Sequence, residues 1–280
     1  MNSESGNHDS GVGRVVFLLG KPARKQPLFP ELFALLQARG KEVQVHLPHD
    51  SGTCLPPGVQ RKDLLVQRGL FPEVLAELLP QEQSGLRFCN PVASTLAVND
   101  RVVLRQRLQS AGLPIPAWQT TADWQEVIAR SRENSLVVKA LDGFIGRGAG
   151  VLFLEKGQCQ APADAPFPGP YLVEEQIAFD GWDRKLYIAG RNCRGLLKKW
   201  PRESGQSNQP FVPEPMLTDL ALATGQALGL EIYGVDIILA QSGPLIVDVN
   251  VFPSFKGIAE AATLIADHIC ALADIKPVPA

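Results

Sequence analysis

The sequence lacks any apolar run that approaches the roughly 20 residues needed to span a bilayer, so a membrane helix is not predicted. Its first residues, Met1 to Gly13, are polar and rich in glycine and serine. They lack the charged start and apolar core of a signal peptide. This segment is predicted to be a disordered lead, and the protein is predicted to be cytoplasmic, without a membrane partner.

Paired cysteines and an excess of basic residues are also lacking. The five cysteines are scattered and form no C-x-x-C motif, which predicts reduced thiols rather than disulfides or a zinc site. The formal net charge is -2, so no nucleic-acid partner is predicted. His46 and His49 flank Pro48 without a third ligand nearby, which favours a surface turn over a metal site.

Neither common glycine-rich nucleotide motif is present. The apolar strand segment 15–19 leads into Gly20-Lys21-Pro22, where a dinucleotide-binding fold would carry G-x-G-x-x-G. A later loop, 141–150, contains four glycines, but no Gly-Lys-Ser/Thr closes it and no helix pattern follows, so it is not a P-loop. It resembles a flap on a hairpin, and an ordinary glycine-rich turn is the alternative. The glycines are Gly143, Gly146, Gly148 and Gly150.

What is present is an alternation of strand and helix patterns. Residues 14–90 alternate apolar strands with amphipathic helices, which predicts an N-terminal α/β domain with a parallel sheet. From residue 91 onward, further strand and helix patterns follow, several of the strands in hairpins. The predicted strands are 15–19, 43–47, 64–66, 136–140, 151–154, 171–175, 185–190, 195–200, 235–238 and 245–250. The predicted helices are 31–39, 72–79, 100–111, 123–132, 218–228 and 259–273, with a polar loop at 202–209.

Two apolar strands near the C-terminus each carry a carboxylate. Asp236 lies in one strand, and Asp248 and Asn250 lie two residues apart in the next. Residues i and i+2 of a strand share a face, so a hairpin would gather all three. Oxygen ligands of this kind suit Mg²⁺. An edge hairpin with a solvated polar face is the alternative, but the apolar neighbours 246, 247 and 249 predict a strand buried on both faces, where unpaired carboxylates are costly.

Two further segments carry groups suited to a nucleotide. Lys139 ends the strand before the glycine loop and could reach phosphates as a point charge; the alternative is a lysine that merely extends its head to solvent. The strand 171–175 ends in Glu174 and Glu175, followed by Gln176 and Ile177. Glu174 could accept from an adenine amine, and a backbone N–H near Gln176 or Ile177 could serve a ring nitrogen.

In this order, the motifs resemble the ATP-grasp superfamily over about residues 90–273. The resemblance is nearest to the branch of the ribosomal-protein glutamate ligase. Its helix start and linker match Asp100-Arg101 and Leu113 to Pro116, and its lysine strand and flap match Val137 to Gly148. The hinge, the D-x-R strand and the metal signature match residues 174–177, 183–190 and Asp236 to Pro253. The resemblance implies an α+β ATP-grasp domain over 91–280. Its two subdomains would enclose ATP, a central lid at about 117–178 and a C-terminal subdomain at about 179–275.

The resemblance also implies a role for each matched residue. Phosphates would be held by Arg101 and Lys139 under a flap with Gly143, Gly146 and Gly148; adenine by Glu174, Glu175, Gln176 and Ile177; and the ribose by Asp183. The metal, Mg²⁺ with Mn²⁺ as the alternative, would be held by Asp236, Asp248 and Asn250. The catalytic cations would be Lys185 and Arg202, and Arg184, Lys198, Ser254 and Lys256 would face the substrate.

Several positions depart from the glutamate-ligase pattern. Arg101 replaces a lysine, Gln176 an aromatic, Asp248 a glutamate and Lys185 an arginine. The run Asn250 to Pro253, with Lys185 and the strand end 198–201, is instead similar to the inositol polyphosphate kinase branch, which phosphorylates a hydroxyl. Lys198 and Lys199 also fit a solvated basic face.

The prediction is therefore a Mg-ATP-dependent carboxylate-amine ligase that acts through an acyl phosphate on a small or peptide-like carboxylate. A small-molecule kinase is the second hypothesis, and a nucleotide-binding module without catalysis is the third. The expected partners are a carboxylate and an amine. A homo-oligomer is left open by the sequence.

Overall fold

The computed structural model describes residues 13–141, 150–157, 164–201 and 207–275. The predicted lead segment lies almost entirely outside these ranges. The chain divides into two compact units: residues 1–92 with 259–280, and residues 93–258. The predicted second domain ran to the C-terminus, whereas in the structure the last helix belongs to the first unit. Within the described ranges, no helix has the length and apolarity needed to cross a bilayer.

The first unit is built on a four-stranded parallel sheet in the order β2-β1-β3-β4. Its strands are β1 (Val15–Leu19), β2 (Val43–His46), β3 (Leu64–Arg68) and β4 (Arg87–Cys89). Its helices are α1 (Leu28–Ala38), α2 (Pro48–Ser51), α3 (Pro72–Gln83) and α8 (Ala261–Ala273), with a 3-10 turn at Ala23–Lys25. The predicted parallel α/β domain is confirmed. All five residues of β1 are buried, as expected for the interior of a parallel sheet.

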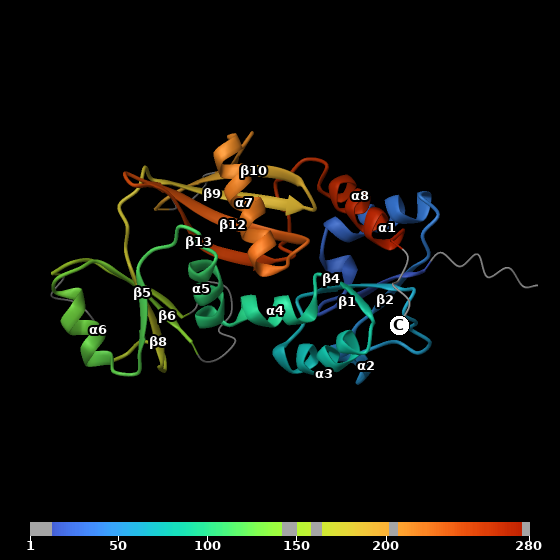
Figure 1. The fold of residues 1–280 in the computed structure, drawn as a ribbon, viewed down its shortest axis with the longest axis horizontal. Helices are drawn as coiled ribbons and strands as arrows, with labels where there is room; N and C mark the ends of the chain where they lie inside the picture. The colour runs from blue at the N-terminus through green and yellow to red at the C-terminus, as the bar shows by residue number, and fades with distance from the viewer. Residues whose placement is uncertain (1–12, 142–149, 158–163, 202–206, 276–280) are drawn as a thin grey trace, which may run out of the picture. The chain divides into compact units, whose positions relative to one another are not determined.

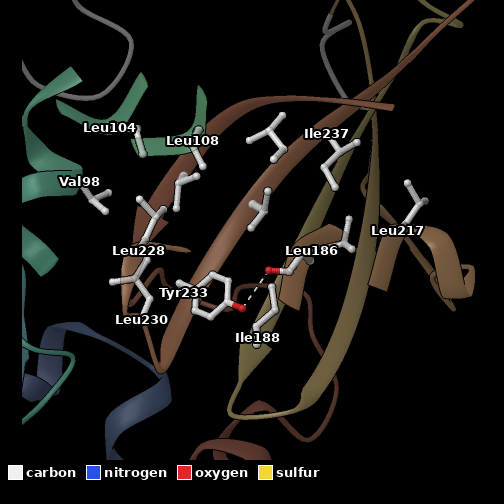
Figure 2. Packing of buried hydrophobic residues seen from close by; sticks show 14 residues of the cluster. Val98, Leu104, Leu108, Leu186, Ile188, Leu217, Leu228, Leu230, Tyr233 and Ile237 are labelled. Atoms are coloured by element: carbon white, nitrogen blue, oxygen red, sulfur yellow. Dashed lines mark hydrogen bonds between the residues drawn. The ribbon is translucent and has the colours of Figure 1, made fainter. Parts of the chain in front are cut away.

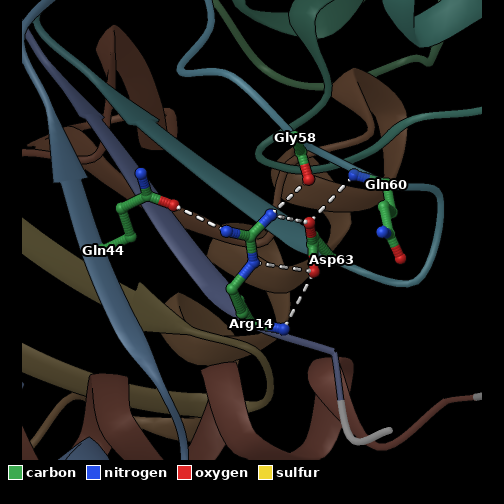
Figure 3. Close-up of polar contacts among 5 residues, drawn as sticks. All are labelled: Arg14, Gln44, Gly58, Gln60 and Asp63. Atoms are coloured by element: carbon green, nitrogen blue, oxygen red, sulfur yellow. Dashed lines mark hydrogen bonds and ion pairs between the residues drawn. The ribbon is translucent and has the colours of Figure 1, made fainter. Parts of the chain in front are cut away.

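One end of this parallel sheet is fixed by a partly buried ion pair (Figure 3). Asp63, just before β3, is fully buried and pairs with Arg14, just before β1, at 2.9 Å. The same carboxylate accepts the backbone N–H groups of Arg14 and Gln60, and the Arg14 guanidinium also donates to the carbonyl of Gly58. The pair therefore joins the starts of two neighbouring parallel strands to the loop before β3.

Helix α8 returns from the C-terminal end of the chain to pack beside α1, as Figure 1 shows within this unit. Its buried face consists mainly of alanine and isoleucine, including Ala262, Ile265 and Ile269. Two ion pairs accompany the contact, Arg39 with Asp267 at 2.6 Å and Lys41 with Asp274. The helix begins two residues later than the sequence predicted.

The second unit contains two antiparallel sheets. The first, in the order β5-β8-β6-β7, comprises β5 (Trp118–Thr121), β6 (Leu136–Ala140), β7 (Val151–Leu154) and β8 (Tyr171–Glu175). Helix α6 (Trp124–Ser131), capped by Asp123, covers one face of it. The strands β6, β7 and β8 have the bounds that the sequence predicted.

The second sheet, in the order β11-β10-β9-β12-β13, carries most of the polar candidates. It comprises β9 (Trp182–Ala189), β10 (Asn192–Lys199), β11 (Gln209–Phe211), β12 (Ile232–Ala240) and β13 (Gly243–Val251). Helices α5 (Arg101–Ser110) and α7 (Pro215–Leu228) cover its apolar face, and α4 (Val92–Asn99) precedes α5. In Figure 2, Leu104 and Leu108 of α5 and Leu217 and Leu228 of α7 lie with the strand residues of this core.

Three sequence predictions in this unit are corrected. The polar loop 202–209 ends one residue into β11, an edge strand that tolerates Pro210. Helix α4 was not predicted, because its short Val/Ser/Thr sequence has low helix propensity. The strand 245–250 was predicted to be buried on both faces, but β13 is an edge strand and Asp248 is exposed.

Candidate active site

A row of charged side chains crosses one face of the second sheet. Asp248 of β13 lies opposite Asp236 of β12, and Asp236 lies opposite Lys185 of β9. The Lys185 ammonium donates to both oxygens of Asp236, at 2.6 and 2.9 Å. The amide of Asn250 donates to Asp248 at 3.2 Å. The predicted hairpin therefore gathers Asp236, Asp248 and Asn250, as the spacing indicated.

The charge balance of this row favours a cation. Burial raises the pKa of Asp236, and repulsion from Asp248 adds to this, although Lys185 opposes it. Two facing carboxylates and one amide are the hard oxygen donors that Mg²⁺ accepts, so the donor set fits this metal. In the described ranges, no cluster of three or more His, Cys, Asp and Glu side chains is placed for a metal; the donor set here has two carboxylates.

The chain after β13 folds back over the same sheet. Pro253 lies so close to Gly234 that a Cβ at Gly234 would meet its ring at 3.1 Å. Phe255 packs on Tyr187 of β9 with ring centroids 5.1 Å apart. Phe252 and Phe255 have φ values of 38° and 52°, a left-handed conformation that costs energy for bulky residues. Packing thus holds the segment after Asn250 beside the carboxylates.

An irregularity in β13 frees one backbone carbonyl. The pairing of β12 with β13 shifts after Asp236, so that Val247 has no cross-strand partner in the register. Its carbonyl instead accepts from Arg105 at 2.7 Å and from Lys139 at 3.4 Å. Bulges of this kind often occur beside active sites. This one connects the second sheet to the helix α5 and the first sheet.

A cavity of about 300 Å³ lies within the second unit, lined by residues of both antiparallel sheets. One face of the first sheet contributes Val137, Lys139, Leu172 and Glu174. The aromatic rings of Phe153 and Trp200, whose centroids are 5.1 Å apart, also line the cavity. Among the described residues predicted to bind the nucleotide, all seven line this cavity: Arg101, Lys139, Glu174, Glu175, Gln176, Ile177 and Asp183. Asp248 lines it as well, which connects the cavity to the carboxylate row.

A buried charge cluster forms one wall of the cavity. Glu174, 3% exposed, accepts from Lys139 Nζ at 2.5 Å through Oε2 and from Arg105 Nε through Oε1. Burial would raise the pKa of Glu174, but the two cations outweigh it and lower that pKa. Burial lowers the pKa of Lys139, and Glu174 opposes the shift. Both oxygens of Glu174 already accept from these two cations. A contact of this side chain with an adenine therefore stays a prediction.

The described residues that were predicted to face the substrate do not line the cavity. Arg184 pairs with Asp180 through both terminal nitrogens, at 3.0 and 2.5 Å, and does not line the cavity. Lys198 lies 3.9 Å from Asp183. Ser254 is half-buried and Lys256 exposed, both in the segment after β13. Gly143, Gly146, Gly148 and Arg202 lie outside the described residues.

Sequence reasoning missed Arg105. The helix 100–111 was predicted as a basic helix, without a role for this residue. Arg105 is 2% exposed and occupies the buried stripe of α5 together with Leu104 and Leu108. An arginine in an apolar stripe needs a partner, since buried charges are paired. That departure from the helical pattern was the available signal.

The family model of the inositol 1,3,4-trisphosphate 5/6-kinase ATP-grasp domain matches residues 200–271. A curated relative, the probable alpha-L-glutamate ligase of Xanthomonas campestris pv. campestris (strain 8004), is 27% identical over 198 residues, which cover 65% of this chain and 67% of that protein.

Solved structures show the same fold over nearly the whole chain. A RimK domain ATP-grasp protein from Sphaerobacter thermophilus DSM 20745 gives a TM-score of 0.69 at 22% identity, covering 91% of this chain and 99% of that one. The resemblance to the ATP-grasp superfamily is confirmed. The ATP-grasp ligase PsnB, complexed with a minimal precursor, Mg and ADP, gives a TM-score of 0.70 at 17% identity. The match covers 93% of this chain and 97% of that one.

The predicted ATP-grasp fold is therefore confirmed, as is the placement among ATP-grasp enzymes that include ligases. The two branches that the motifs resembled both appear among the matches. The glutamate ligases are similar over most of the chain, whereas the kinase model matches only its C-terminal part.

Proposed function

We propose that this ATP-grasp protein is a Mg-ATP-dependent ligase that joins a carboxylate to an amine. The observation that carries the proposal is the cavity of about 300 Å³, where the described nucleotide candidates line one space with Asp248. Ligand sites are commonly apolar cavities with a few convergent polar groups. The relatedness to alpha-L-glutamate ligases and to PsnB supports ligation over other uses of ATP.

The adenine would lie between the apolar walls of the cavity. Val137, Leu172 and Ile238 supply these walls from both sheets. The backbone amides of Glu175 and Gln176 donate to Ala117 and Ser135, so the strand end is held firmly. The next amide, that of Ile177, has no hydrogen bond to any residue in the described ranges. We assign it to a ring nitrogen of the base.

The phosphates would extend from the adenine toward the carboxylate row. Arg101 lies at the N-terminal end of α5, where the helix dipole favours anions. Lys139 adds a second cation to the lining of the same cavity. Asp183, which also lines the cavity, is suited to a ribose hydroxyl.

Mg²⁺, or Mn²⁺ in its place, would be held by Asp236, Asp248 and Asn250. A metal at this row would neutralise the phosphate charge that builds up during transfer. Lys185 now compensates Asp236. On metal binding the ammonium of Lys185 would become available to the anionic substrate, the role that we assign to it together with Arg202, Lys198, Ser254 and Lys256.

The reaction would proceed in two balanced steps. A substrate carboxylate oxygen attacks the γ-phosphorus, the bond to the β-phosphate oxygen breaks, and ADP leaves. The nitrogen of the amine then attacks the acyl carbon, loses a proton, and expels inorganic phosphate. Each turnover thus yields one amide, one ADP and one phosphate. The cations around the cavity would orient the two anions and stabilise the charge of the transition state.

The test uses the reactivity of the acyl phosphate. Hydroxylamine traps an activated carboxyl group as a hydroxamate, so ATP, Mg²⁺ and hydroxylamine are incubated with pools of amino acids and short peptides. We expect ADP, phosphate and a hydroxamate in equal amounts from at least one pool. If phosphate appears only without a hydroxamate, or ADP forms regardless of the carboxylate, the ligase proposal is wrong.

A small-molecule kinase is the second candidate, favoured by the kinase family model over residues 200–271. Both reactions share the nucleotide site, so ATP binding does not separate them. With γ-labelled ATP and pools of polyols and inositol phosphates, a kinase would leave the label on the hydroxyl compound. It would release no free phosphate. Label on a polyol would replace the ligase with this candidate, and absence of turnover with every pool would favour a non-catalytic nucleotide-binding module.

A further inference from the structure

The buried cluster beside the cavity is a closed set of interactions between four groups. Two cations, Arg105 and Lys139, share two acceptors, the Glu174 carboxylate and the Val247 carbonyl. Arg105 donates through Nε to Glu174 and through Nη2 to Val247 at 2.7 Å. Lys139 donates to the other Glu174 oxygen at 2.5 Å and to Val247 at 3.4 Å. Each donor is thereby fixed relative to the other.

The cluster joins parts of the chain that are far apart in sequence. Arg105 comes from α5, Lys139 and Glu174 from the neighbouring strands β6 and β8, and Val247 from the bulge of β13. Both cations line the cavity. The Lys139 ammonium is a compact point charge on a flexible stem. The planar fork of an arginine holds two acceptors in fixed directions, which a lysine cannot do.

Two of the charged side chains in the cluster are almost completely buried. Arg105 and Glu174 are 2% and 3% exposed. A single buried carboxylate with one lysine would be neutral; the arginine leaves the cluster with one net positive charge beside the cavity. Arg105 thus adds both orientation and charge at a place where neither is needed for the apolar core of α5.

We propose that Arg105 is a positioning residue for nucleotide binding. It fixes one oxygen of Glu174, so that the other oxygen directs the Lys139 ammonium toward the phosphates. The inference rests on the proposed ATP site, and it assigns to Arg105 a function that operates only through Lys139. Its signature is selectivity, because the phosphates of ATP need Lys139, whereas adenosine, which has none, does not.

The test measures binding of a non-hydrolysable ATP analogue with Mg²⁺, and of adenosine, by calorimetry on the full chain. Arg105→Met keeps the length and removes the fork; Arg107→Met, exposed on the same helix, is the matched control. We expect Arg105→Met to weaken the analogue about tenfold or more and adenosine less than about twofold. Arg107→Met should change neither. Arg105→Lys should recover part of the loss, because it keeps the charge but not the fork.

A double-mutant cycle separates positioning from direct contact. In a Lys139→Ala background, adding Arg105→Met should cause no further selective loss for the ATP analogue. Additive losses would overturn the proposal and would mean that Arg105 contacts the nucleotide itself; its Nη1 has no hydrogen-bond partner within the described ranges. Equal losses for both ligands would also overturn it and indicate a merely structural role.

Two further outcomes are distinguishable. If the wild-type chain bound neither ligand, the proposed function would fail before Arg105 was tested. If Arg105→Met did not fold, Arg105→Lys would carry the test. For Arg105→Lys, a selective loss of about threefold for the ATP analogue that disappears in the Lys139→Ala background supports the proposal. Unchanged affinity of Arg105→Lys for the analogue overturns it.

Discussion

At the scale of the residue, the carboxylate row shows what single side chains contribute. Asp248 is exposed, while Asp236 is largely enclosed and bonded to Lys185. Replacing each by asparagine therefore has different consequences for folding, although both should remove a metal ligand. The spacing of Asp248 and Asn250 was sufficient to predict that they lie together. The bond between Asp236 and Lys185 depends on strand register, which the sequence did not reveal.

Asp248→Asn should lower turnover at least about 100-fold and leave the melting temperature unchanged, because the removed charge is exposed and makes no buried ion pair. Asp236→Asn should also lose turnover, but with a lower melting temperature, since Lys185 then faces a neutral amide. Asp219→Asn, an exposed carboxylate on α7, is the control. Turnover with Mg²⁺ near the wild-type rate in either variant would refute that residue as a ligand.

Asp63 gives a prediction about pH. Burial alone would raise its pKa, but the hydrogen bonds from Arg14 and the backbone N–H of Gln60 outweigh it, and the pKa is lowered. A carboxyl group with a lowered native pKa stabilises the fold above its unfolded pKa of about 3.9. That stabilisation is lost as the pH falls through the native pKa.

At pH 7, Asp63→Asn should lower the free energy of unfolding of the first unit by about 3 kcal/mol, because it leaves Arg14 unpaired. The difference from wild type should shrink as the pH falls below about 4, where the wild-type carboxyl also becomes protonated. Urea unfolding at several pH values measures this. Asp50→Asn, at an exposed position, is the control, and a pH-independent difference would contradict the assignment.

At the scale of the element, local signals defined most helices and strands of the second unit. Asp100 and Asp123 cap α5 and α6, and apolar strand patterns bounded by loops gave β6, β7 and β8. What local signals did not give was tertiary: the edge position of β13, the bulge at Val247 and the return of α8 to the first unit. These features follow from pairing partners remote in sequence, which periodicity does not encode.

Ile265→Ala tests the role of α8. Ile265 is fully buried on the face of α8 that packs in the first unit, so the truncation should cost about 2–5 kcal/mol. Hydrogen exchange of the β1 and β3 amides should become faster, and exchange of β6 and β8 should not. Ala271→Gln, at an exposed position of α8, is the control. Faster exchange confined to the second unit would contradict the assignment of this helix.

At the scale of the whole molecule, the order of motifs carried more information than any motif alone. Lys139, the strand end at Glu174 and Asp248 are each weak signals, yet the fold brings all three to one cavity. The superfamily and its fold could therefore be predicted. The charge cluster of Arg105 could not, because its four members come from four different elements and the position of Arg105 on α5 matched an apolar stripe.

The same cavity predicts how the whole protein responds to nucleotide. A ligand that binds only the native state, present at 100 times its dissociation constant, stabilises that state by about 2.7 kcal/mol. ATP with Mg²⁺ should therefore raise the melting temperature of the second unit, and Lys139→Ala should lose most of the rise. Without nucleotide, Lys139→Ala should melt near the unliganded wild type. The substitution removes one positive charge from the cluster, and Arg105 still pairs with Glu174.

Lys156→Ala is the matched control, because Lys156 is exposed in the same unit and does not line the cavity. Scanning calorimetry with ATP and Mg²⁺, ATP and EDTA, and adenosine separates the contributions. The metal should be required for the full rise with ATP and be irrelevant to adenosine, since only the triphosphate reaches Asp236 and Asp248. A full rise in Lys139→Ala would show that this lysine only stabilises Glu174 in the fold, and the phosphate site would then have to be sought at Arg101.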